Sequence, residues 1–111
     1  MVVVIFRSRL KPGVEKEIEE LGGRMYALGS AMPGFISYRE YAAADGEAVA
    51  IVEFESLETL SAWREHPAHR QAQELGRSKF FSEYRITVCE PVRDYAFPRG
   101  TLRGLGEKQS H

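Results

Sequence analysis

The chain has 111 residues and a mass of 12.6 kDa, enough for one domain around one hydrophobic core. Hydrophobic residues make up 43% of the sequence and charged residues 28%, as in an ordinary globular domain. Lys and Arg number 15 against 16 Asp and Glu, so the net charge of −1 gives no reason to expect a nucleic-acid or membrane partner. Cys89 is the only cysteine, which excludes an internal disulfide and a multi-cysteine metal site.

The first strand is predicted over Val2–Arg9, where β-branched and aromatic residues lead to the turn-forming Lys11-Pro12-Gly13. The uninterrupted apolar run at its start, Val2–Phe6, has no basic segment before it. That run is too short for a signal peptide or a membrane span. We therefore expect a soluble, cytoplasmic protein.

A helix is predicted next, because apolar residues recur at intervals of three and four along one stripe. The stripe consists of Val14, Ile18, Leu21, Met25, Leu28 and Met32. Gly22 and Gly23 lie within this helix, and we expect the pair to allow close packing against a sheet. Met32-Pro33-Gly34-Phe35 ends the helix, since the residue before a proline resists helical geometry and Gly34 supplies a turn.

Two strands joined by a hairpin are predicted after this stop. They cover Phe35–Ala44 and Ala48–Glu55, and Asp45-Gly46 between them favours a tight turn because both positions accept a positive φ. Ser56 is expected to cap a following helix that runs as far as His66.

A further helical run is predicted from Pro67, a residue favoured at the first helical position, to Gly76. The last strand is predicted over Tyr84–Val92. Its residues alternate between two faces, with Tyr84, Ile86 and Val88 on one and Arg85, Thr87 and Cys89 on the other.

The order strand, helix, strand, strand, helix, strand predicts a ferredoxin-like α+β fold, in which both helices cover one face of an antiparallel sheet. We expect one domain over residues 1–97 and a flexible tail over residues 98–111, with Tyr95–Phe97 as a short edge or cross-subunit strand. Some strands are apolar on both sides, so the uncovered face is expected to pack against a second copy in a homodimer.

Three residues around Pro67 are candidates for a ligand site. Trp63, His66 and Arg70 are spaced so that they can share one helix face. Together they can form a wall on which a flat aromatic ligand stacks beside a titratable imidazole. The plainer alternative is a core tryptophan and a histidine that closes a helix end.

Other polar residues carry weaker signals. Arg85 can bind an anionic or phenolic oxygen, or form an ion pair in a dimer interface, and Ser8 can line a cavity or mark the exposed end of its strand. His66 and His69 lack a third ligand at suitable spacing, so we expect no metal. No phosphate loop, nucleophile elbow or paired-carboxylate motif is present, so an enzyme of this sequence would work without a tightly held nucleotide. Such chemistry needs a substrate that reacts with oxygen once it is bound, desolvated and deprotonated.

Three segments carry a family resemblance in their order and spacing. They are the opening VVVIFRSRLKPG, the MPGF turn, and the block ESLETLSAWREHPAHRQAQELGRSKFFSEYRITV, whose most specific part is a tryptophan followed by a His-Pro-x-His step. Over roughly residues 2–97 the chain thereby resembles the antibiotic biosynthesis monooxygenase family. The resemblance implies a dimeric α+β barrel of ferredoxin-like protomers, each with a cavity between sheet and helices that the family's helix tryptophan, here Trp63, would line.

The resemblance also implies a reaction. Members of the family oxidise phenolic polyketide or quinol substrates without a cofactor, while another branch degrades haem. The haem-degrading branch has a histidine ten residues after the tryptophan, where this chain has Gln73, and an asparagine in the first strand, where it has Ser8. His66 and His69 lie too early to replace that histidine. The cofactor-free reaction is therefore the one expected.

The leading hypothesis is a cofactor-independent monooxygenase that oxidises an electron-rich aromatic, such as a quinol or polycyclic phenol, with molecular oxygen. Trp63 would bind the substrate together with Ser8 and Arg70. His66 would accept or donate the phenolic proton, and Arg85 would stabilise oxyanion charge. The alternatives are a non-catalytic small-molecule-binding or stress-related dimer, and a haem oxygenase with a substituted ligand.

Overall fold

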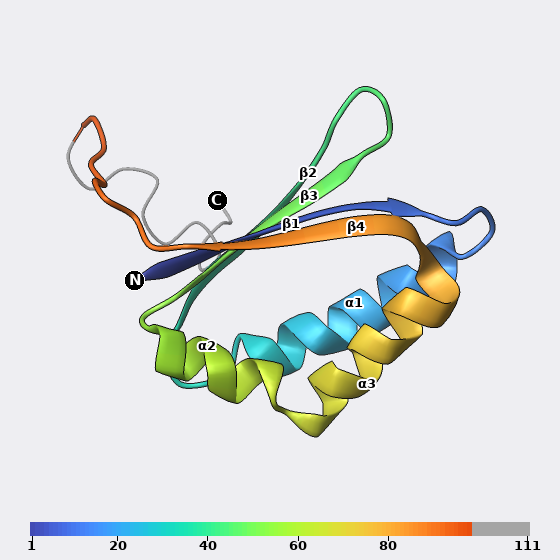
Figure 1. The fold of residues 1–111 in the computed structure, drawn as a ribbon, viewed down its shortest axis with the longest axis horizontal. Helices are drawn as coiled ribbons and strands as arrows, with labels where there is room; N and C mark the ends of the chain where they lie inside the picture. The colour runs from blue at the N-terminus through green and yellow to red at the C-terminus, as the bar shows by residue number, and fades with distance from the viewer. Residues whose placement is uncertain (99–111) are drawn as a thin grey trace.

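The computed structural model describes residues 1–98 and shows one antiparallel sheet with all helices on one face (Figure 1). The strands are β1 (Val2–Leu10), β2 (Phe35–Ala42), β3 (Ala48–Phe54) and β4 (Phe81–Cys89), in the order β2-β3-β1-β4. The helices are α1 (Glu15–Gly29), α2 (Leu57–Arg64) and α3 (Pro67–Leu75), and a π-helical turn, η1 (Gly76–Phe80), leads into β4. The predicted ferredoxin-like α+β fold is confirmed.

The core lies between the sheet and the helices. Strand residues alternate between the two faces, and Val2 and its register partner Phe54 point to the helix side, where both are almost fully buried. Leu60 and Trp63 of α2 complete this cluster. A second cluster of Val14, Leu21 and Phe80 lies where α1 meets η1.

The predicted stripe of α1 is largely confirmed, but two expectations about this helix are wrong. Leu28 remains 41% exposed. A Cβ placed on Gly22 or Gly23 would meet nothing within 4 Å, so this pair makes no close packing contact. The close approach occurs at Gly29, where a Cβ would lie 3.0 Å from Cζ2 of Trp63. The helix turns Gly29 inward at its last residue, and Leu28 beside it therefore faces outward.

The predicted cap of α2 is confirmed. The Ser56 hydroxyl accepts the backbone N–H of Thr59 at 3.1 Å, and the Thr59 hydroxyl accepts the backbone N–H of Ser56 at 3.1 Å. The helix predicted as far as His66 ends at Arg64, and α3 begins at Pro67 as expected. A sharp corner therefore separates α2 from α3.

The C-terminal strand differs from the prediction in its bounds. It runs over Phe81–Cys89 rather than Tyr84–Val92, because its ladder with β1 ends where Cys89 pairs with Val3 near the start of that strand. Tyr95–Phe97 forms no strand within the described chain. Most of the predicted tail, residues 99–111, lies outside the described residues. No helix in residues 1–98 is long and apolar enough to cross a membrane.

Candidate functional site

Three rings gather at the corner between α2 and α3. Trp63, near the end of α2, lies with its ring centroid 5.6 Å from that of His66 and 4.6 Å from that of His69. Trp63 is only 8% exposed and packs in the core cluster with Val2 and Phe54. Most of the indole surface is therefore buried in the core, and the two imidazoles are its polar neighbours.

His66 has a structural function at this corner. It is the N-cap residue of α3, and its Nδ1 accepts the backbone N–H of Ala68 at 3.1 Å. An Nδ1 that accepts a hydrogen bond is unprotonated, so a neutral His66 carries its proton on Nε2. In this state the ring offers a donor, rather than an acceptor, to a ligand.

His69 lies one turn into α3 and is half-buried. Its Nδ1 is enclosed and has no hydrogen-bond partner among residues 1–98. Burial lowers the pKa of His69, a hydrogen bond with the backbone of Arg64 raises it, and the charges of Arg64 and His66 lower it. From the sequence, His69 is a candidate only as a metal ligand, because spacing along the chain does not show which side chains meet across a helix corner.

Ser8 lies on the helix side of the sheet and is 5% exposed. It is the register partner of Tyr84 in β4, whose ring packs against those of Phe6 and Phe81 at centroid distances of 5.7 and 5.9 Å. Ser8 therefore belongs to the helix side, as a ligand site between the sheet and the helices requires.

The helix-side face of β4 is only partly covered. Its large side chains retain exposures of 40–49%, although they point to the same side as the helices; they are Tyr84, Ile86 and Val88. The helix layer thus leaves an apolar strip of strand surface open. An exposed apolar strip of this kind is where a flat aromatic ligand gains most from desolvation.

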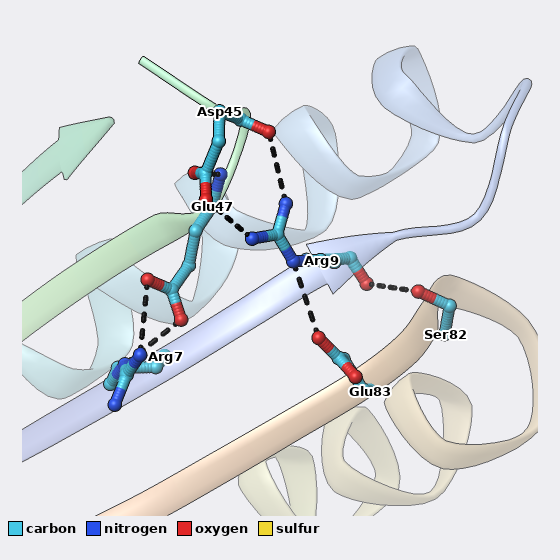
Figure 2. A network of polar contacts seen from close by, with 6 residues as sticks. All are labelled: Arg7, Arg9, Asp45, Glu47, Ser82 and Glu83. Atoms are coloured by element: carbon cyan, nitrogen blue, oxygen red, sulfur yellow. Dashed lines mark hydrogen bonds and ion pairs between the residues drawn. The ribbon is translucent and has the colours of Figure 1, made fainter. Parts of the chain in front are cut away.

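Arg85 lies on the opposite face of the sheet. Its register partner is Arg7, which forms an ion pair with Glu47 at 2.8 Å on the side that the helices leave open. Figure 2 shows the polar network of this open face around Arg7 and Arg9, with Arg9 paired to Asp45. Trp63 and His66 lie on the helix side of the sheet, whereas Arg85 points to the open side. The sheet therefore separates Arg85 from these two residues within one protomer.

Arg70 lies on the exposed surface of α3. It is 3.5 Å from Glu65 in an ion pair whose side chains are both more than half exposed. It also lines a shallow depression of about 460 Å³ formed by residues of α3 and η1 alone. Arg70 thus lies on the outer surface, whereas Ser8 is buried in the sheet. Among residues 1–98, no group of three His, Cys, Asp or Glu side chains is placed to hold a metal ion.

A family model described as antibiotic biosynthesis monooxygenase matches residues 1–75, which span β1 to α3 and include Trp63. The chain belongs to the antibiotic biosynthesis monooxygenase family. A curated relative, the uncharacterized protein YqjZ of Bacillus subtilis, is 31% identical over 98 residues, which cover 88% of this chain and 85% of the relative.

Several solved structures share the fold of this chain. Rv0793 from Mycobacterium tuberculosis aligns with a TM-score of 0.74 and 26% identity, covering 86% of this chain and 98% of that one. SnoaB, a cofactor-independent oxygenase from Streptomyces nogalater, aligns with a TM-score of 0.72 and 17% identity, covering 88% of this chain and 97% of that one. At this low identity the likeness to SnoaB shows the fold alone.

Proposed function

We propose that this protein is a cofactor-independent monooxygenase that oxidises an electron-rich aromatic, a quinol or polycyclic phenol, with molecular oxygen. The proposal rests on the cluster of Trp63 with two imidazoles, which lies on the same side of the sheet as the partly uncovered face of β4. The chain also belongs to the antibiotic biosynthesis monooxygenase family. SnoaB, of the same fold, is a cofactor-independent oxygenase, which supports this reaction class.

The proposed chemistry needs the protein to bind the substrate in a water-free site and to remove a proton from it. The apolar strip of β4 and the edge of Trp63 bind the aromatic ring and exclude water from it. An imidazole then takes the phenolic proton, which makes the substrate a stronger electron donor. The electrons for oxygen reduction come from the substrate itself. One oxygen atom enters the product, and the other leaves as water with two substrate hydrogens.

Oxygen uptake tests this proposal directly. The purified protein is supplied with a panel of hydroquinones and anthrone-like phenols, with and without haemin. Protein-dependent uptake without haemin is expected, reduced in Trp63→Phe and unchanged in Lys16→Gln, a control on the exposed surface of α1. Uptake only with haemin would favour a haem oxygenase. Tight binding of an aromatic without uptake would favour a non-catalytic binding protein.

We also propose a homodimer formed through the open face of the sheet. Apolar residues of two neighbouring strands lie on that face, where no helix covers them; they are Val3, Ile5, Val49 and Ile51. Arg85 lies on the same face, where it could form an ion pair across the dimer interface. Sedimentation velocity should give the mass of a dimer for the wild type and of a monomer for Ile5→Lys. The cytoplasmic location stays a prediction for cell fractionation to test.

A further inference from the structure

The two imidazoles beside Trp63 differ in their hydrogen bonds. His66 uses its Nδ1 to hold the first turn of α3 through the N–H of Ala68. If that Nδ1 became protonated, the cap would be lost. His69, in contrast, is the one residue of the described chain with a buried side-chain nitrogen or oxygen that lacks a hydrogen-bond partner.

An enclosed polar atom without a partner is unfavourable, and folded proteins normally pair such an atom with another group, a water molecule or a ligand. The ring of His69 is positioned by packing, since its centroid lies 4.6 Å from that of Trp63. A ligand hydroxyl that reaches this ring displaces no hydrogen bond at Nδ1. At His66 the same hydroxyl would compete with the backbone of Ala68.

The placement of His69 on α3 directs it toward the interior. Ala72, three residues further on and on the same helix face, packs against the cluster of Val14, Leu21 and Phe80. On the strand side, Tyr84 and its neighbours in β4 leave an open apolar strip. An aromatic bound on that strip lies on the same side of the sheet as His69 and Trp63.

We propose that His69, positioned against Trp63, is the imidazole that contacts the bound aromatic and accepts its phenolic proton. This step rests on the proposed function. The phenolic O–H bond breaks and an N–H bond forms on a ring nitrogen of His69, which leaves a phenolate and an imidazolium, and no electron is transferred. Burial lowers the pKa of His69, as do the charges of Arg64 and His66, so the ring is neutral and able to accept a proton at pH 7.

The experiment uses 4-nitrophenol, whose absorption spectrum reports its ionisation and which needs no oxygen to do so. At a pH below the probe's own pKa, the wild-type protein should increase the phenolate band. His69→Gln should lose this increase, with His69→Ala as a second variant if the first does not fold. The matched control is Gln71→Ala, on the exposed surface of α3, which should keep the band. His66→Gln tests the other imidazole and should lower Tm because it removes the cap of α3. With a quinol that the wild-type protein oxidises, His69→Gln should lower kcat by about 10²-fold or more and leave KM nearly unchanged.

Two results would overturn the assignment: a band that disappears in His66→Gln but persists in His69→Gln, or a wild-type protein that does not ionise the probe. A band that depends on His69 in a protein with no oxygen uptake would support the contact and reject only the oxygenase function. The failures of the two proposals are therefore distinguishable.

Discussion

The two faces of the sheet are built from alternate residues of the same strands, yet different interactions stabilise them. On the helix side, Val2 and Phe54 pair at 1% and 0% exposure against α2. On the open side, Arg7 and Arg9 form ion pairs with Glu47 and Asp45 at 2.8 Å in partly exposed positions. Apolar burial contributes about 25 cal/mol per Å², whereas exposed ion pairs are screened by solvent and contribute little. Most of the protomer's folding free energy therefore comes from the helix side.

The largest expected effect is at the most buried residue of the helix side. Phe54→Ala removes a ring that is fully enclosed and should lower the free energy of unfolding by about 3–5 kcal/mol, as urea denaturation would measure. Ile51→Ala, on the open face of the same strand, is the control and should cost clearly less. Equal losses from both variants, independent of protein concentration, would contradict the difference between the two faces.

A smaller effect is expected where α1 meets α2. Gly29→Ala would place a Cβ 3.0 Å from the Trp63 ring, so the indole must shift, at a cost of about 1–3 kcal/mol in thermal or urea unfolding. Gly22→Ala, in the same helix, meets nothing within 4 Å and should instead stabilise the protein by about 0.5–1 kcal/mol. If Gly29→Ala were also stabilising, the packing of Trp63 against α1 would be looser than the structure shows.

On the open face, the loss of an ion pair should have little effect. Arg7→Gln removes the bonds of the Arg7 guanidinium to Glu47 and should lower unfolding free energy by about 0.2–1 kcal/mol, with the difference shrinking in high salt. Denaturation of wild type and variant at low and high ionic strength measures this. A loss as large as that of Phe54→Ala would show that the open face carries far more stability than its exposure indicates.

The two faces should also respond to acid in different pH ranges. The pKa of His69 is lowered from its ordinary value of 6.5, so the unfolded chain binds its proton more readily and stability falls as the pH drops below about 6.5. The pKa of Asp45 is lowered from 3.8 by a backbone hydrogen bond from Glu47 and by Arg9, so its contribution is lost only below about pH 4. His69→Gln should flatten the stability profile between pH 7 and 5, whereas Asp45→Asn should not.

The sequence determined the elements and their order, because the rules involved are local. The three- and four-residue spacing of α1, the Ser56 cap and Pro67 at the start of α3 act within a few residues of each other. The alternation of β4, with Tyr84 and Arg85 on different faces, follows from the pleat of any strand. These features were predicted without knowledge of what packs against them.

Tertiary structure alone decided which residues meet. Alternation separates Arg85 from Tyr84, but only the packing of the helices shows that the face of Arg85 is the open one. The corner after α2 brings His69 closer to Trp63 than His66, which is nearer in sequence. Such contacts depend on the angle between two helices, and that angle is set by the core against which both of them pack.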